Sequence, residues 1–265
     1  MKRMIALVLI LALAPMAGAA AQTLRVGMEC DYAPFNWMQA EPSDTAVPVE
    51  SGGYADGYDV QIAVLIAEAL ARELVIVRTD WDTLPVSLTT GGIDAIIAGM
   101  SPTAERAESI DFSDAYYESD LVIVVRKDSP YAAAQTLADL SGARIAGQRS
   151  TFHDTVIDQI PGVRRQTPMP DFPTMIVAVT AGTIDGYVSE EPGALAAVFA
   201  NPDLTFITFA EGQGFVASRL DLSIAVGLQQ GSDLVEPINA ALAALDEEAR
   251  EQMMIDAILR QPLNQ

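Results

Sequence analysis

A short phrase built on glycine, isoleucine and aspartate occurs twice in the chain, and it constrains the fold more than any other feature. Gly91-Gly92-Ile93-Asp94-Ala95 follows a stretch of helical spacing and leads into apolar residues 96–98. Gly182-Thr183-Ile184-Asp185-Gly186 stands in the same position before residues 187–189. One domain does not normally repeat a helix–turn–strand unit so far along the chain, so the repeat predicts two similar lobes. Chance similarity between short α/β turns is the alternative.

The residues around the first copy alternate between strand and helix patterns. The expected strands are 24–28, 74–78 and 95–98, and the expected helices are 60–71 and 84–90. Asp59 is the expected N-cap of the first helix. Alternation of this kind predicts an α/β fold with a parallel sheet covered by helices on both faces.

Two apolar strands are expected to connect the lobes, at 121–126 and 222–228. If both pass between the lobes, they form a two-stranded hinge, and the second lobe is an insertion into the first. The predicted domain boundaries are then 22–119 plus 222–265 for lobe 1 and 120–221 for lobe 2, which are ordinary domain sizes. Amphipathic helices at 233–244 and 247–259 complete the chain.

The first 21 residues have the form of a secretory signal peptide. Lys2 and Arg3 precede an apolar run at 4–16, and small residues occupy 17–21. The alternatives are a membrane anchor or a buried strand, but the run is short for a bilayer. We therefore expect cleavage before Gln22 and a soluble protein of the periplasm.

The single cysteine and the single histidine say little about function by themselves. Cys30 cannot form an intrachain disulfide, and it lacks the small residues that precede a lipidation site. Cys30 and His153 would suit a nucleophile and its base, but nothing local pairs them. We interpret both residues as structural.

The composition excludes some partners. The chain has 36 acidic and 15 basic side chains, a net charge of −21, which argues against nucleic acid and anionic lipid. Half of the residues are hydrophobic and 19% are charged, so a core can form. We interpret most acidic residues as a solvated surface.

Two loops follow the expected strands and carry polar side chains. In open parallel sheets, ligands bind beyond the carboxyl ends of the strands. The loop 99–106 offers a glycine, two hydroxyls and Arg106, and we expect Ser101 or Thr103 to cap a helix that carries Arg106. Free amides and a guanidinium form a receptor for a carboxylate or phosphate.

The second loop, 189–192, offers an acidic pair that suits an amine. Together the two loops complement the zwitterion of an α-amino acid. In the alternative interpretation, Arg106 pairs with Glu105 or Glu108, and the glutamates of the second loop are solvated. The residues alone leave both interpretations open.

A larger set of motifs, in order and spacing, resembles the polar amino acid family of periplasmic binding proteins, which serve ABC importers. The matching segments are Gly27 to Trp37, Gly57-Tyr58-Asp59, Trp81 to Leu88, Gly92-Ile93-Asp94, Gly99 to Arg106, Ile110 to Ser113 with Tyr116-Tyr117, Gly182 to Pro192, and Ala225 to Leu228. They cover nearly everything after residue 22. The resemblance implies a two-lobed fold of the type II periplasmic-binding-protein class with two hinge strands.

The resemblance also implies roles for single residues. Arg106 would bind the ligand α-carboxylate, assisted by Ser101 and the nearby backbone at Gly99 and Met100. Thr151, three residues after Gln148, would reach the same carboxylate from the second lobe, although Ser150 stands where the family often has glycine.

Further roles concern the amine and the ligand side chain. Glu190 stands where the family usually has the aspartate that binds the α-amino group, and Glu191 competes for this role. Tyr32 and Trp81 would flank the ligand side chain, with plain core packing as the alternative.

Glu29 is the residue that bears on selectivity. It precedes Tyr32 by three positions, where relatives that take basic amino acids often carry an acid. A carboxylate there would pair with a guanidinium or ammonium. Its alternatives are an exposed side chain or a pair with Arg25. The segment 39–55 is longer than in many relatives and is expected to rim the cleft.

The resemblance therefore implies a protein that captures an L-amino acid and delivers it to an ABC transporter permease. A basic ligand such as arginine or lysine is favoured over a neutral one such as glutamine. We expect a monomer with no catalytic activity, cofactor or metal. The alternatives are a cyclohexadienyl dehydratase-like lyase on the same fold, with Glu190 as general acid, and a ligand sensor for a separate receptor.

Overall fold

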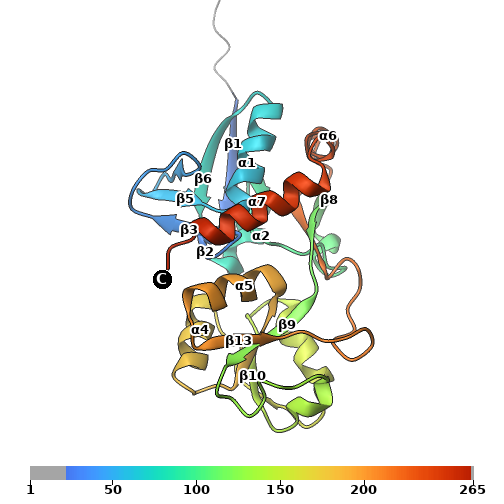
Figure 1. Cartoon of the computed structure of the whole chain (residues 1–265). Helices are drawn as coiled ribbons and strands as arrows, with labels where there is room; N and C mark the ends of the chain where they lie inside the picture. Colours follow the sequence, from blue (N-terminus) through green and yellow to red (C-terminus); the bar gives the residue numbers. More distant parts are fainter. Residues whose placement is uncertain (1–21, 264–265) are drawn as a thin grey trace, which may run out of the picture.

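Two five-stranded sheets, one in each lobe, form the framework of the protein (Figure 1). The computed structural model describes residues 22–263, so the expected signal peptide at 1–21 lies outside the described residues. Among the helices of the described part, none is long and apolar enough to cross a membrane.

The first lobe contains both ends of the described chain. Its sheet has the order β6-β1-β7-β14-β8, in which β1 is parallel to β6 and β7, whereas β14 is antiparallel to β7 and β8. The strands are β1 (Thr23–Met28), β6 (Glu73–Arg78), β7 (Ala95–Ile96), β8 (Ile110–Glu118) and β14 (Ser223–Gln229). The helices are α1 (Tyr58–Ala69), α2 (Leu84–Thr89), α6 (Val235–Ala243) and α7 (Glu247–Arg260). The expected helices and the parallel part of the sheet are confirmed, with ends that differ by a few residues.

A second, smaller sheet lies along one side of this lobe. Its order is β2-β3-β5-β4, from the strands β2 (Asp31–Tyr32), β3 (Asn36–Gln39), β5 (Tyr54–Asp56) and β4 (Val47–Pro48). The segment 39–55 extends this sheet and contributes no residue to the cavity between the lobes. The expectation that it rims the cleft is wrong.

The second lobe repeats the plan of the first. Its sheet has the order β11-β10-β12-β9-β13, with β10 parallel to β11 and β12, and β9 antiparallel to β12 and β13. The strands are β9 (Leu121–Arg126), β10 (Arg144–Ala146), β11 (Arg164–Arg165), β12 (Gly186–Glu190) and β13 (Leu204–Ile207). The α-helices are α3 (Phe152–Thr155), α4 (Phe172–Thr180) and α5 (Glu191–Ala200), and α5 lies on the side that faces the first lobe (Figure 1).

The repeated phrase has the same structural role in both lobes. Arg25 of β1 binds Asp94 with 2.6 Å between Nη2 and Oδ1. Its Nη1 also donates to the carbonyls of Gly91 and Gly92. Arg144 of β10 binds Asp185 at the same distance and donates to the carbonyls of residues 182 and 183. The aspartate of each phrase therefore fastens the helix–strand turn to the neighbouring parallel strand.

The connection between the lobes differs from the expected hinge strands. β9 lies wholly in the second sheet, and β14 lies wholly in the first. The chain crosses between β8 and β9 and returns between β13 and β14, and the two crossings meet where the Ser119 amide donates to the Leu222 carbonyl over 3.0 Å. Both strands exist as expected, but neither passes between the lobes.

Asp59 is not a helix cap. α1 begins one residue earlier, and its N-cap is Gly57. The Asp59 side chain is fully buried and accepts hydrogen bonds from Asn36 Nδ2 at 2.8 Å and the Tyr116 hydroxyl at 2.7 Å. Burial raises the pKa of Asp59 to about 6.

Candidate functional site

A small polar cavity lies between the two lobes, at the carboxyl ends of β7 and β12. Its room of about 10 Å³ is on the scale of a single water molecule. The lining residues are Tyr32, Trp81, Gly99, Ser101, Arg106, Gln148, Thr151, Phe152, His153 and Glu190. Eight of these are residues that the sequence proposed, and the lobes are closed over them.

Arg106 lies on the first-lobe wall in a single 3₁₀ turn, η2 (Arg106–Glu108), and not in the expected α-helix. Thr103 Oγ1 accepts from the Arg106 amide at 3.4 Å, so the capping contact exists without a helix behind it. The chain leaves this turn directly for β8. The argument from a helix N-terminus therefore does not hold here.

The half-buried guanidinium of Arg106 binds carbonyl oxygens. Nη1 donates to Ser101 at 2.9 Å and Nη2 donates to Ser150 of the second lobe at 3.1 Å. Loss of hydration lowers the pKa of Arg106 to about 10. In the described residues it forms no ion pair, so the expected alternative pairing with the exposed Glu105 or Glu108 is wrong. A cation without a counterion is suited to receive an anion.

Trp81 and Ser150 complete this end of the cavity. The Trp81 ring lies 5.1 Å from Arg106 Cζ, in the range of a cation–π contact, and its Nε1 reaches the Ser150 carbonyl at 3.5 Å. Ser150 has φ 59°, in the left-handed region that favours glycine. The loop therefore keeps the left-handed backbone conformation that glycine favours, although the residue there is serine. Thr151 follows it and donates Oγ1 to the Gln148 carbonyl at 2.7 Å.

Glu190 lies on the second-lobe wall as the last residue of β12, and it is buried. One carboxylate oxygen, Oε2, accepts from the Tyr32 hydroxyl of the first lobe, and the other, Oε1, lies 2.8 Å from His153 Nε2. Glu191 begins α5 and is exposed, so only Glu190 points into the cavity.

The environment of Glu190 keeps it ionised. Burial opposes its negative charge, but the charge of His153 and the contacts with His153 and Tyr32 outweigh this effect. The pKa of Glu190 is therefore below its ordinary value. This carboxylate is suited to an ammonium group.

Glu29 lies behind Gln148, directly after β1. Its Oε1 accepts from Gln148 Nε2 across the lobes at 3.2 Å, and its side chain is buried. Burial, followed by the charge of Asp31, raises the pKa of Glu29 well above its usual value. Neither expected alternative holds, because Glu29 is not exposed and Arg25 is bound to Asp94.

Gly99 and Met100 have different positions. Gly99 has φ +62° and lines the cavity, where a Cβ would come within 3.0 Å of the Tyr32 ring. Met100 does not line the cavity, since its side chain is buried and its carbonyl accepts from the Ala225 amide at 3.0 Å.

The sequence missed two lining residues, Phe152 and His153. The interpretation of His153 as structural leaves out its contact with Glu190. The available signal was its place two residues after Thr151, in the loop already assigned to the site.

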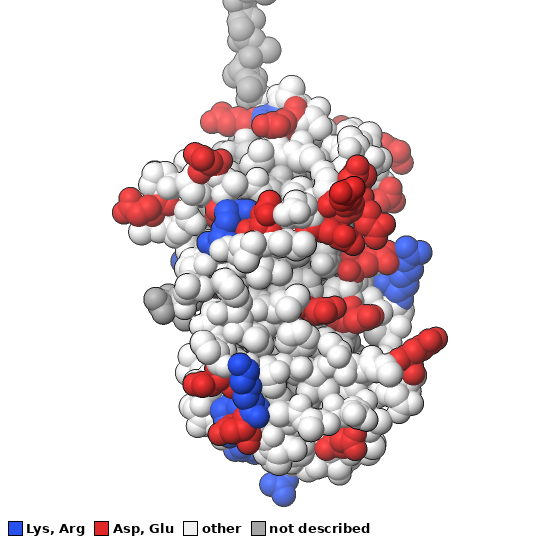
Figure 2. Space-filling view, viewed as in Figure 1, with Lys and Arg blue, Asp and Glu red and all other residues white. Residues whose placement is uncertain are grey.

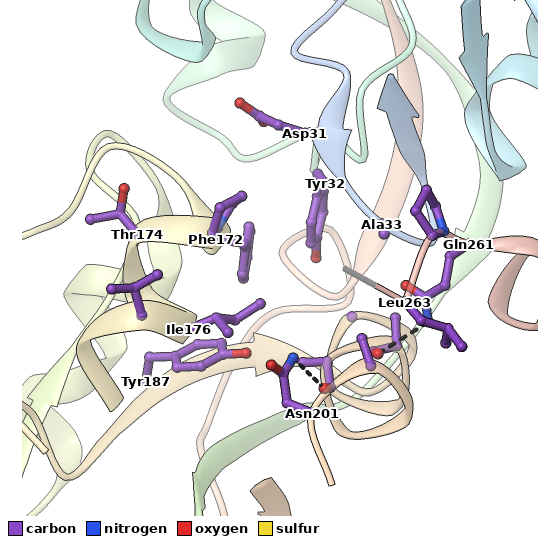
Figure 3. A pocket seen from close by; sticks show the side chains of 17 residues that line it. Asp31, Tyr32, Ala33, Phe172, Thr174, Ile176, Tyr187, Asn201, Gln261 and Leu263 are labelled. Atoms are coloured by element: carbon purple, nitrogen blue, oxygen red, sulfur yellow. Dashed lines mark hydrogen bonds between the residues drawn. The ribbon is translucent and has the colours of Figure 1, made fainter. Parts of the chain in front are cut away.

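A larger, mostly apolar cavity of about 350 Å³ lies on the other side of Tyr32. Figure 3 shows Tyr32 between Phe172 and the C-terminal residues Gln261 and Leu263. The Tyr32 and Phe172 rings are stacked with 4.1 Å between their centroids. Tyr32 lines both cavities, and Phe172 lines only the larger one.

The outer surface shows the acidic balance of the chain. On the face in Figure 2, acidic side chains are spread over both lobes and basic ones are few. The arrangement on this face fits the solvated surface that the composition predicts.

Comparison with known proteins identifies the family to which this chain belongs. A family model described as bacterial extracellular solute-binding proteins, family 3, matches residues 24–256. The chain belongs to this family. ABC transporter arginine-binding protein 1 of Escherichia coli is 28% identical over 265 residues, which is 97% of this chain and 98% of that protein. The arginine-binding extracellular protein ArtP of Bacillus subtilis is 26% identical over 84% of this chain and 81% of its own length.

Solved structures agree with the fold. An amino acid ABC transporter substrate-binding protein of Streptococcus pneumoniae, bound to L-arginine, has a TM-score of 0.76 and 30% identity, covering 89% of this chain and 94% of that one. An ancestral arginine-binding protein bound to glutamine has a TM-score of 0.72 and 26% identity, covering 90% of this chain and 98% of that one. Members of family 3 that resemble this chain are thus binding proteins for amino acids.

Proposed function

We propose that this protein binds one L-amino acid between its lobes and presents it to the permease of an ABC importer. The observation that carries the proposal is the pair of opposite charges on facing walls. Within residues 22–263, Arg106 has no carboxylate partner, and Glu190 is held ionised. An α-carboxylate and an α-ammonium on one carbon match these two groups.

We further propose that the ligand side chain is basic, as in arginine or lysine. Glu29 is a buried carboxylate with no cation bound to it among residues 22–263; the nearby Arg78 donates only to the Glu29 main-chain oxygen, at 3.3 Å. A guanidinium or ammonium group on the ligand side chain would supply the positive partner that the Glu29 carboxylate lacks. The arginine-binding relatives support this ligand class, whereas the glutamine-bound ancestral protein shows that neighbours of similar fold also take a neutral side chain.

Binding requires the lobes to separate, because about 10 Å³ does not hold an amino acid. The contacts that close the empty cleft pair ligand-binding groups with the other lobe: Arg106 with Ser150, Tyr32 with Glu190, and Glu29 with Gln148. A ligand that replaces these contacts with stronger ionic ones shifts the equilibrium toward a closed, loaded form.

Binding is favoured over lyase activity by the state of Glu190. A general acid must hold a proton at working pH, and the environment of Glu190 lowers its pKa instead.

A thermal-shift screen of the common L-amino acids tests the proposal, with prephenate and arogenate added as lyase substrates. A ligand at 100 times its dissociation constant adds about 2.7 kcal/mol to stability. Arginine or lysine should raise the melting temperature most. The absence of a shift with every amino acid, or turnover of either cyclic acid, would overturn the proposal.

A further inference from the structure

The larger cavity beside Tyr32 has no role in the proposed function. It offers about 350 Å³ of room, and its lining is mostly apolar. Cavities of this size and lining are typical sites for small organic molecules. A closed apolar cavity of about 150 Å³ holds one benzene ring, so the cavity beside Tyr32 has room for two fused rings.

One polar group inside this cavity lacks a partner. Tyr187 lies in β12, is 1% exposed, and packs edge-on against Phe172 with 6.1 Å between the ring centroids. Figure 3 shows its hydroxyl pointing into the cavity, toward Asn201. Burial alone raises the pKa of Tyr187, and no hydrogen bond to its hydroxyl is found within residues 22–263. Buried hydroxyls normally have a partner, so this group points to a ligand atom.

The other polar groups of the cavity are neutral amides. Asn201 and Gln261 each donate Nδ2 or Nε2 to a main-chain carbonyl of α5, which leaves their side-chain oxygens as acceptors. Asp31 is the only lining residue with a charged side chain, and Figure 3 shows that side chain directed away from Tyr187. The cavity therefore suits an uncharged molecule.

Both lobes contribute walls to the cavity. Tyr32 and residues 261–263 belong to the first lobe, whereas α4 and α5 belong to the second. Gln261 Nε2 joins the two walls by donating to the Ala196 carbonyl of α5 over 3.0 Å. The cavity is complete only while the lobes are together, so a molecule inside it contacts both lobes.

We propose that this cavity is a second ligand site, which takes an uncharged aromatic molecule of one or two rings with a single hydroxyl group and thereby favours the closed form. The rings contact the apolar walls, and the hydroxyl accepts from Tyr187 and donates to the Asn201 side-chain oxygen. One hydroxyl thus partners both groups. The same ring system without a hydroxyl would leave Tyr187 unpaired, at a cost in affinity.

Occupation of this site should strengthen amino acid binding. The amino acid also favours the closed form, and two ligands that favour one form raise each other's affinity by the same factor. Tyr32 lines both cavities, so the two sites share a wall. A molecule in the second site is therefore an activator of capture and not a competitor.

Calorimetric titration with β-naphthol, in the absence of any amino acid, tests the site. The wild type should bind one β-naphthol per chain, and naphthalene, which lacks the hydroxyl, should bind more weakly. Tyr187→Phe removes the hydroxyl and keeps the ring beside Phe172. It should weaken β-naphthol roughly two- to tenfold, leave naphthalene unchanged, and bind L-arginine within a few-fold of wild type. No saturable binding to the wild type, or equal β-naphthol affinity in the variant, would overturn the proposal.

Two further measurements locate the site and test the coupling. Ala197→Leu adds bulk to the buried α5 wall and should abolish β-naphthol binding. L-arginine titrated into protein saturated with β-naphthol should bind more tightly than into the free protein. An arginine affinity that is unchanged or weakened would overturn the proposed coupling. Because β-naphthol binding is measured without an amino acid, its failure leaves the proposed function intact.

Discussion

Arg106 of the first lobe donates Nη2 to the main-chain oxygen of Ser150 in the second lobe, at 3.1 Å. A cation thus holds the empty cleft closed through a neutral acceptor, although the same nitrogen would bind a carboxylate more strongly. If Arg106 receives the ligand carboxylate as proposed, the closed empty form and the loaded form compete for one guanidinium. Arg106 is thus a closing contact, and under the proposed function it is also the receptor for the ligand carboxylate.

Replacement of Arg106 should remove binding of every amino acid. Hydrogen bonds to charged groups contribute about 1.5–3 kcal/mol each, so loss of a bidentate contact predicts at least about a hundredfold weaker affinity for Arg106→Ala. Isothermal calorimetry with L-arginine measures it. Arg126→Ala, which removes an arginine paired with the exposed Asp128 in the second lobe, is the matched control and should stay within a few-fold of wild type. An equal loss in both variants would contradict the assignment.

Glu29→Gln should change selectivity. The variant keeps a polar side chain beside Gln148 but loses the negative charge, so arginine and lysine should weaken about tenfold or more relative to glutamine. Competition calorimetry with the three ligands gives the ratio. Equal weakening of all three would show that Glu29 does not interact with the side-chain charge.

Tyr32→Phe should open the empty protein. It removes the hydroxyl that bridges to Glu190 and retains the ring stacked on Phe172. Loss of one hydrogen bond to a charged group, about 1.5–3 kcal/mol, predicts a larger open population. Small-angle X-ray scattering without ligand should give a larger radius of gyration than wild type, and with arginine the same radius. Identical ligand-free scattering curves would count against the role of this contact in closure.

The two repeated arginines should contribute similarly to stability. Arg25→Ala and Arg144→Ala each remove an aspartate contact and bonds to two carbonyls at equivalent turns. Both groups are partly solvated, so each variant should lower the melting temperature by only a few degrees. Differential scanning calorimetry measures the two values. A large loss in one lobe and none in the other would show that the turns are not equivalent.

Local patterns predicted much of the fold and the site. The repeated glycine–isoleucine–aspartate phrase predicted two lobes. In the structure, the aspartate of each copy is bound by an arginine of the neighbouring parallel strand, so the repeat has the same role in both lobes. Arg106 and Glu190 could be found because ligand-binding loops follow the carboxyl ends of strands. These signals are contained in a few consecutive residues.

The errors concern contacts between distant residues. Helical spacing cannot distinguish a capping Asp59 from a buried one, because its partners Asn36 and Tyr116 lie far along the chain. The apolar pattern predicts hinge strands at 121–126 and 222–228, but strand pairing depends on neighbours that the pattern does not show, and each strand lies within one sheet. The same reason applies to His153, since its contact with Glu190 joins α3 and β12, which are far apart in the sequence.

The most direct test of the central claim is a calorimetric titration of the protein with L-arginine and with agmatine, which has the same guanidinium chain and amine but no α-carboxylate. The account predicts one arginine per chain and agmatine binding weakened at least about a hundredfold, because Arg106 then has no carboxylate to receive. Equal affinity for the two compounds, or no heat of binding with L-arginine or any other L-amino acid, would contradict it.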